Sequence, residues 1–159
     1  MNLSEDFEDF IKLLNKYKVA YMVVGGYALA FHGKPRYTGD MDIWIDISDE
    51  NATKMLKVIH EFGFASLKLK KKDFLKPAYT TQIGYPPLRI DILNEIDGVD
   101  FKEAFANMQK IDADGLIINY IGLNDLIKNK QTTGRPKDVS DVQELKKIGK
   151  LYGAKRKRK

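Results

Sequence analysis

The sequence predicts an α/β (α+β) protein, in which a mixed β-sheet is flanked by helices and followed by a C-terminal helical extension. In the first two thirds of the chain, short segments of period-two alternation interleave with segments of helical period. In the last third, a hairpin signal precedes two helical segments. We expect a core over residues 1–122, packed C-terminal helices over 123–151, and a basic, disordered tail over 152–159.

The first half of the chain predicts two long helices and two strands. Ser4 is a suitable N-cap for a first helix, which has one apolar face made of Phe7, Phe10, Ile11 and Leu14. Residues 19–24 are rich in β-formers, and a short Ala-rich helix is expected over 27–32. Residues 41–47 alternate between apolar and polar side chains, as a strand does. Ser48 is then expected to cap the helix that Gly63 ends.

The second half predicts shorter elements, punctuated by Pro, Gly and capping residues. An edge strand protected by lysines is expected over 65–72. The elements expected after it are strands over 79–83 and 88–93, a helix capped by Asp100, a hairpin over 111–120 turning at Asp114-Gly115, a helix capped by Asn124, and a last helix over 137–151.

The net charge of +5 resides in the C-terminal tail. Five of the 27 basic residues occupy positions 155–159, and 27 − 5 = 22 balances the 22 acidic residues of the whole chain. The body of the protein is therefore formally neutral. The tail has two interpretations, a solvated disordered segment or a short arm that contacts nucleic-acid phosphates.

The composition excludes several classes of site and location. The chain has no cysteine, which excludes disulfides and thiolate metal sites and is compatible with a reducing cytosol. The acidic N-terminus does not resemble a signal peptide, and no apolar run approaches the roughly 18 residues of a membrane span. We therefore predict a cytoplasmic protein with no membrane partner.

Two carboxylates on one predicted strand suggest a metal site. Asp40 and Asp42 are two residues apart, so both side chains leave the same face of the strand. Their mutual repulsion is relieved if a hard cation such as Mg²⁺ lies between them. Asp91 occupies a second strand with a similar apolar face. If the two strands are neighbours, three carboxylates converge, and two metal ions could clamp a phosphoryl-type displacement.

The Gly25-Gly26 pair predicts a phosphate site beside those carboxylates. The glycines lie between a strand and a helix, where free backbone N–H groups gather. Glycine also lets a phosphate approach the backbone closely. An anion site and a metal site on one segment indicate a polyphosphate–metal substrate.

These residues together resemble the DNA polymerase β-like nucleotidyltransferase superfamily. The resemblance is closest to the small branch that includes minimal nucleotidyltransferases and the toxin half of type IV abortive-infection pairs. It rests on an early group, Gly25-Gly26-Tyr27-Ala28, His32-Gly33, Arg36, Thr38, Asp40 and Asp42. It also rests on a late group, Leu126-Ile127, Lys130, Gly134-Arg135-Pro136-Lys137-Asp138, Asp141 and Leu145. Much of the superfamily has Gly-Ser where this chain has Gly25-Gly26.

The resemblance implies a nucleoside triphosphate bound with two Mg²⁺ ions, and transfer of NMP to a hydroxyl with release of pyrophosphate. Asp40, Asp42 and Asp91 would hold the metals, and Asp91 could also accept the proton of the acceptor. Gly25 and Gly26 would hold phosphates. The acceptor would be RNA, tRNA or a protein, and an antitoxin-like protein partner is expected if the branch is right. The alternative is a catalytically idle nucleotide- or RNA-binding module of the same fold.

Three further residues are candidates for nucleotide binding. Arg36 is expected to neutralise phosphate charge or to be a surface arginine, and Thr38 to brace the loop before Asp40. Lys130 is expected to reach the triphosphate or to lie on a solvated helix face.

Two other features have a plainer interpretation. Asp138 and Asp141 fall in the first turns of the last helix, where capping is the preferred explanation. Trp44 is expected to be a half-buried sheet residue or to stack on a base.

Overall fold

The computed structural model describes the backbone of residues 3–157 and the side chains of residues 3–152. The helices are α1 (Glu5–Lys16), α2 (Gly25–Phe31), α3 (Asp49–Glu61), α4 (Phe101–Ala106), α5 (Leu123–Thr133) and α6 (Pro136–Lys157). The strands are β1 (Tyr21–Val24), β2 (Asp40–Ile45), β3 (Thr80–Ile83), β4 (Arg89–Leu93), β5 (Gln109–Ala113) and β6 (Leu116–Tyr120). Among the described residues, no helix is both long and apolar enough to cross a bilayer.

The strands form one mixed sheet in the order β3-β4-β2-β1-β6-β5. β2 lies in the middle, antiparallel to β1 and parallel to β4. In the β2–β4 register, Asp40 is opposite Arg89 and Asp42 is opposite Asp91. The predicted α/β fold with a mixed sheet is confirmed.

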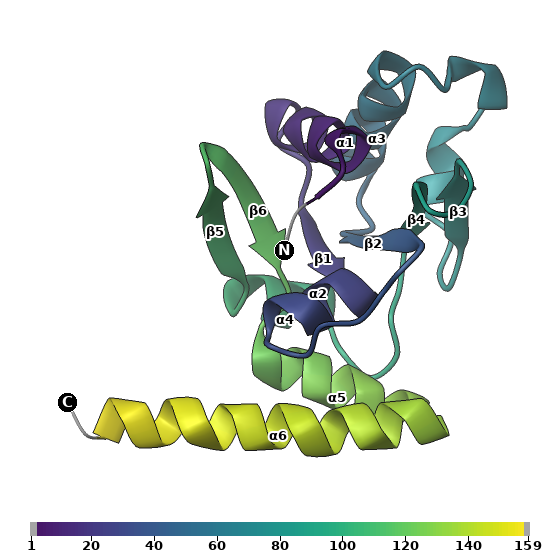
Figure 1. The fold of residues 1–159 in the computed structure, drawn as a ribbon. Helices are drawn as coiled ribbons and strands as arrows, with labels where there is room; N and C mark the ends of the chain where they lie inside the picture. Colours follow the sequence, from purple (N-terminus) through teal and green to yellow (C-terminus); the bar gives the residue numbers. More distant parts are fainter. Residues whose placement is uncertain (1–2, 158–159) are drawn as a thin grey trace.

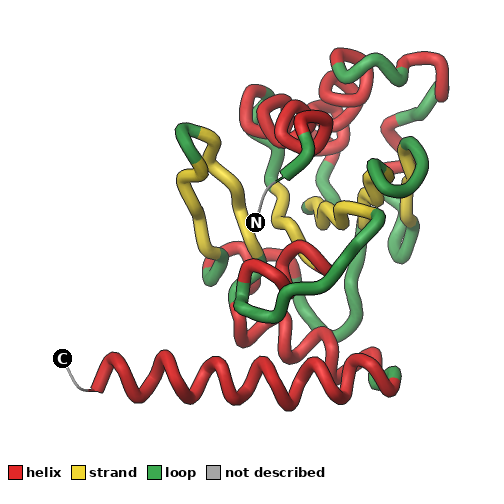
Figure 2. The backbone as a smooth tube through the Cα atoms, in the orientation of Figure 1, coloured by secondary structure: helices red, strands yellow, loops and turns green. Residues whose placement is uncertain are grey.

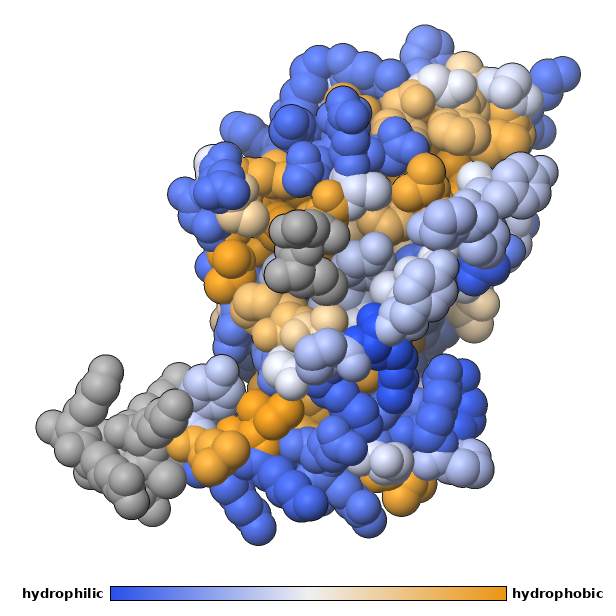
Figure 3. Space-filling view, in the orientation of Figure 1, coloured by the Kyte–Doolittle hydropathy of each residue, from blue (hydrophilic) through white to orange (hydrophobic). Residues whose placement is uncertain are grey.

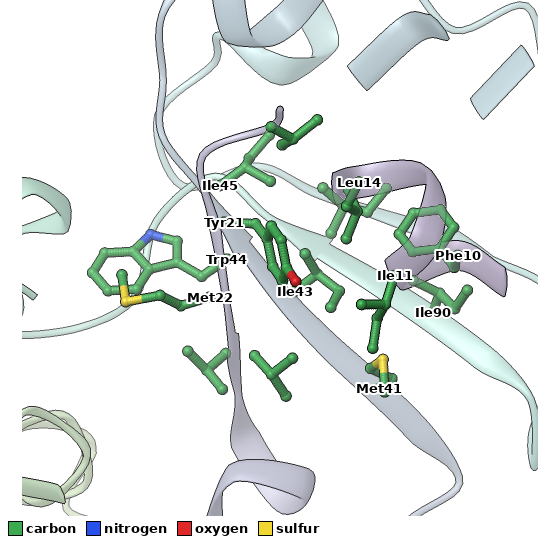
Figure 4. Packing of buried hydrophobic residues seen from close by; sticks show 14 of the residues in the cluster. Phe10, Ile11, Leu14, Tyr21, Met22, Met41, Ile43, Trp44, Ile45 and Ile90 are labelled. Carbon is green, nitrogen blue, oxygen red and sulfur yellow. The ribbon is translucent and has the colours of Figure 1, made fainter. Parts of the chain in front are cut away.

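Helices cover both faces of this sheet (Figure 1), with α1 and α3 on one side and α2, α5 and α6 on the other. Figure 4 shows Met41 and Ile43 of β2 pointing towards Ile11 and Leu14 of α1, whereas Trp44 points the opposite way. Met41 and Ile43 are completely buried. Because strand side chains alternate between faces, burying these residues sends Asp40 and Asp42 to the opposite face, where α2 begins.

Most predicted elements are confirmed, and their caps explain where they start. Ser4 accepts a hydrogen bond from the Phe7 amide at 3.3 Å, and Ser48 accepts one from the Asn51 amide at 3.1 Å. Asp100 caps α4 in the same way, through the Glu103 amide at 3.1 Å. The β5–β6 hairpin turns at the predicted Asp114-Gly115, whose φ angles of 53° and 92° suit a two-residue turn.

The edge strand predicted over residues 65–72 is wrong. This region forms two short 3₁₀ segments, Ala65–Leu67 and Lys71–Phe74. Lys68 adopts a left-handed conformation with φ 51°, which interrupts any extended run. The Asp73 carboxylate accepts a 2.7 Å hydrogen bond from the Lys70 amide, so a local side chain replaces a strand partner.

Three helix boundaries also differ from the prediction. α2 starts at Gly25, so the glycine pair belongs to its first turn rather than preceding it. α5 has Gly122 and not Asn124 at its N-cap position, and a Cβ at Gly122 would lie 2.8 Å from the Asn107 carbonyl oxygen. α6 continues to Lys157, beyond the predicted end at Leu151 (Figure 2). The side chains of the basic tail, 155–159, lie outside the described residues.

Candidate active site

The three predicted carboxylates meet on one face of the sheet. Asp42 and Asp91 are paired across β2 and β4, and Asp40 is one register step away on the same face. Each residue offers an oxygen, and these oxygens all lie within 4.8 Å of one another. The predicted adjacency is therefore confirmed, and the donor set of carboxylate oxygens suits a hard divalent cation.

The pKa values of the three acids are shifted in different directions. Burial, reinforced by repulsion from Asp40 and Asp91, raises the pKa of Asp42 to about 7. Burial also raises the pKa of Asp91, although Arg89 offsets part of that effect. At Asp40 the effect of burial is outweighed by hydrogen bonds, first from Thr38, which lower its pKa. The cluster thus carries negative charge that is poorly compensated at Asp42.

Arg89 and Thr38 are the hydrogen-bond donors around the cluster. The Arg89 guanidinium donates from Nε to Asp91 Oδ1 at 2.9 Å, and from Nη2 to Asp91 Oδ2 and Asp40 Oδ2 at 3.1 Å each. The Thr38 hydroxyl lies 3.0 Å from Asp40 Oδ1 and 2.9 Å from the Asp40 carbonyl oxygen. This supports the predicted bracing role of Thr38. Arg89 was not predicted as a site residue, although its place two residues before Asp91 on the same strand face was a usable signal.

Gly25 and Gly26 are required by close packing against this site. Gly25 has φ 65°, and a Cβ there would collide with the Asp42 carboxylate. A Cβ at Gly26 would lie 3.1 Å from Cβ and Oγ1 of Thr38. Much of the DNA polymerase β-like superfamily, which this chain resembles, has a serine at this position. A serine at position 26 would therefore require Thr38 to shift. The first turn of α2 therefore packs directly against Asp42 and Thr38.

We expect Gly25→Ala to destabilise the protein and to displace Asp42. A left-handed residue that gains a Cβ costs roughly 1–3 kcal/mol, and here the collision with Asp42 adds to that cost. Gly63→Ala is the matched control, because Gly63 also has positive φ, 100°, but its Cβ would meet no atom within 4 Å. Thermal unfolding of both variants separates the collision from the backbone strain. Equal losses of stability would contradict close packing at Gly25.

Arg36 and Lys130 do not join the carboxylate cluster. Arg36 donates to Asp141 through Nη2 at 2.6 Å and Nη1 at 3.1 Å. Lys130 is 8% exposed and binds Asp138 at 3.3 Å and Asp141 at 3.0 Å. Lys130 is therefore a buried ion-pair residue and not part of a solvated helix face. The nucleotide-binding role of both residues stays a prediction.

The side chains of Asp138 and Asp141 are more than helix caps, because both are completely buried. Asp138 accepts from Thr133 and from Arg135 at 2.7 Å each, and Asp141 also pairs with Lys34 at 2.9 Å. The buried-charge network is the set Lys34, Arg36, Lys130, Thr133, Arg135, Asp138 and Asp141. Figure 3 shows strongly hydrophilic side chains where the loop between α2 and β2 meets the C-terminal helices. This network fixes α5 and α6 to the loop that carries Thr38.

Trp44 lies on the same face as the acids, but it is only 2% exposed. Its ring makes an edge contact with Phe101 of α4, at 5.0 Å between ring centroids. This contact supports the interpretation of Trp44 as a sheet residue and leaves no exposed face for a base.

The comparison with protein families agrees with this site. The family described as "Nucleotidyltransferase of unknown function" (DUF6036) matches residues 1–152. The chain belongs to this family. The matched residues of this nucleotidyltransferase family member include the three carboxylates, the glycine pair and the buried-charge network. No curated protein matches the chain.

Solved structures share the fold of this nucleotidyltransferase family member at low sequence identity. A candidate nucleotidyltransferase from Thermotoga maritima is 17% identical with a TM-score of 0.53, and the match covers 96% of this chain and 88% of that one. An antigenic nucleotidyltransferase-like protein from Paracoccidioides brasiliensis is 17% identical with a TM-score of 0.55, covering 94% and 78%. ANT(2″)-Ia, solved with adenylyl-2″-tobramycin, is 11% identical with a TM-score of 0.54, covering 96% and 95%.

Proposed function

We propose that this chain is a Mg²⁺-dependent nucleotidyltransferase that transfers NMP from an NTP to a hydroxyl acceptor and releases pyrophosphate. The observation that carries the proposal is the convergence of Asp40, Asp42 and Asp91 beside the first turn of α2. Membership of a nucleotidyltransferase family supports the same reaction.

The residues of the cluster fit a divalent cation. Three carboxylates share one small region, where burial and repulsion from Asp40 and Asp91 raise the pKa of Asp42 to about 7. Asp40, Asp42 and Asp91 would hold magnesium, with two ions expected from the superfamily resemblance. Magnesium bound there would withdraw charge from the α-phosphate and the leaving pyrophosphate and would acidify the acceptor hydroxyl.

The chain's own residues then account for the transfer. Asp91 accepts the proton of the acceptor hydroxyl, whose oxygen forms a bond to the α-phosphorus. The bond from the α-phosphorus to the bridging oxygen breaks, and the electron pair leaves with pyrophosphate. The backbone N–H groups of Gly25 and Gly26 bind the β- and γ-phosphates at the start of α2. Thr38 holds Asp40 in place throughout.

The acceptors are proposed from the superfamily resemblance and from one structural neighbour. RNA, tRNA and protein hydroxyls follow from the superfamily resemblance, as do the toxin–antitoxin role and the antitoxin-like partner. The bound product of ANT(2″)-Ia, adenylyl-2″-tobramycin, adds a small-molecule hydroxyl to the acceptors worth testing. These acceptors, ATP as the donor and the cytoplasmic location stay predictions.

The experiment is a transfer assay with each of the four labelled NTPs, Mg²⁺, and an acceptor panel of total RNA, tRNA, protein extract and an aminoglycoside. We expect wild-type protein to label one acceptor and to release pyrophosphate. Asp91→Asn should lose more than about 100-fold of this rate, because even residues that only support metal ligands are worth 10–100-fold. EDTA should abolish the wild-type signal.

The binding-module alternative predicts a different pair of results. Calorimetry would then show NTP binding by the wild-type protein, while transfer and pyrophosphate release would match those of Asp91→Asn. That combination would contradict the proposed catalysis.

A further inference from the structure

Arg89 occupies the position from which a cation would compensate two of the three carboxylates. Its register partner across β2 and β4 is Asp40, and Asp91 follows two residues later on the same strand face. Its guanidinium binds both oxygens of Asp91 and one oxygen of Asp40, at 2.9–3.1 Å. Planar, two-point binding of this kind is the strongest pairing that arginine makes with a carboxylate.

The contacts of Arg89 overlap with those that a metal ion needs. An ion shared by the cluster must bind Asp40 and Asp91, and the guanidinium already engages three of their four oxygens. Two positive groups drawn to the same oxygens also repel one another in a partly buried site. Within the described part of the chain, Arg89 makes no hydrogen bond to Asp42.

Arg89 is more exposed to solvent than the Asp91 carboxylate that it binds. Its side chain is 30% exposed, whereas the Asp91 side chain beside it is only 9% exposed. The guanidinium can therefore swing towards solvent on its flexible stem, while the carboxylates remain fixed on the sheet.

We propose that Arg89 is a built-in counter-cation that competes with divalent metal for Asp40 and Asp91 and so sets the metal affinity of the site. This inference rests on the proposed metal-dependent function. Arg89 must leave the carboxylates when metal binds, and its guanidinium is then available to an anion that arrives with the metal, such as a triphosphate. Free metal ion alone is bound weakly, because it displaces Arg89 without offering it a new partner.

The test is a titration of the metal-free protein with Mn²⁺ alone, in which free Mn²⁺ is followed by electron paramagnetic resonance and no nucleotide is present. We expect Arg89→Gln to bind Mn²⁺ at least about 10-fold more tightly than wild type, since the competing charge-assisted hydrogen bonds to Asp40 and Asp91 are lost. Arg89→Lys keeps the charge without the two-point geometry and should fall between them. Lys16→Gln, which removes a positive charge paired with Glu61 at the exposed surface, should match wild type.

One further variant locates the effect, and two results would overturn it. The double variant Arg89→Gln/Asp42→Asn should lose the gain, which places the tighter site at the carboxylates. A circular dichroism melt confirms that each variant is folded at the titration temperature. Equal or weaker Mn²⁺ binding by Arg89→Gln would contradict the competition while leaving the proposed function intact. No Mn²⁺ binding by either protein would contradict the metal-dependent function itself, and the competition with it.

Discussion

Asp42→Asn is expected to remove nucleotidyl transfer and, at neutral pH, to make the folded protein more stable. The variant loses a ligand charge at the centre of the cluster, so we expect transfer to fall by more than about 100-fold. It also removes a carboxylate whose pKa is raised to about 7 by burial and by repulsion from Asp40 and Asp91. We expect the stability to rise by at least about 1 kcal/mol, or roughly 3 °C in Tm.

The pH dependence of this gain identifies its cause. An acid whose pKa rises on folding destabilises the folded state once the pH exceeds its unfolded value of about 4. The gain of Asp42→Asn should therefore be absent near pH 4 and complete above about pH 7, in melts recorded with EDTA.

Asp46→Asn is the matched control for Asp42→Asn. Asp46 follows β2 on the chain and lies outside the carboxylate cluster. Its variant should change neither transfer nor Tm appreciably. If Asp42→Asn retained wild-type transfer, Asp42 would not be a catalytic residue. A stability gain that does not depend on pH would show that charge repulsion is not its cause.

The carboxylate site was predictable because its signals are local. Asp40 and Asp42 share a strand face by the two-residue period alone, and Asp91 needed only one further assumption, that its strand is a neighbour. The structure meets that assumption through the Asp42–Asp91 register pair. Ser4, Ser48 and Asp100 were predictable for the same reason, since a cap acts on an amide three residues away.

The buried-charge network was not predictable, because its pairs are remote in sequence. Arg36 and Asp141 are 105 positions apart, and nothing in either segment indicates the other. Each residue alone has an adequate local explanation, a surface arginine or an acid near a helix start. Only the tertiary fold turns Asp141 into a completely buried acceptor. The lysines around residue 70 misled for a different reason, because a local hydrogen bond from the Lys70 amide to the Asp73 carboxylate takes the place of a strand partner.

Asp141→Asn is expected to be strongly destabilising. The Asp141 carboxylate is completely buried and pairs with Lys34, Arg36 and Lys130 at 2.6–3.0 Å. Removing one partner of a buried ion pair typically costs about 3–5 kcal/mol, because the opposite charge stays buried. That cost is a large part of the 5–15 kcal/mol typical of a whole domain. Urea unfolding should show a correspondingly lower midpoint, with Tm lower by roughly 10 °C.

Glu144→Gln is the matched control on the same helix. Glu144 also pairs with Lys34, at 3.2 Å, but its side chain is 52% exposed. An exposed pair is worth about 0–1 kcal/mol, so this variant should unfold close to wild type. If the two variants lost the same stability, burial of the Asp141 charge would not be what holds α6 in place.

Lowering the pH should destabilise the protein through the buried-charge network, whereas it should relieve the destabilising charge at the carboxylate site. Hydrogen bonds from Arg135 and Thr133, together with Lys130, outweigh the effect of burial and lower the pKa of Asp138 to about 2. Arg36, Lys34 and Lys130 likewise hold the pKa of Asp141 far below its usual range. Acids with a lowered pKa stabilise the folded state above their unfolded pKa of about 4, and this stability is lost as the pH falls towards their folded pKa.

Wild-type protein should therefore lose stability steeply below pH 4, whereas Asp141→Asn should show a shallower slope there because one titrating group is gone. Parallel curves for wild type and Asp141→Asn would contradict a charged Asp141 in the network.

Loss of Asp141 should also affect catalysis, because Arg36, its partner, anchors the loop in which Thr38 braces Asp40. Loss of Asp141 should thus lower transfer by about 10–100-fold even at temperatures where the variant is folded.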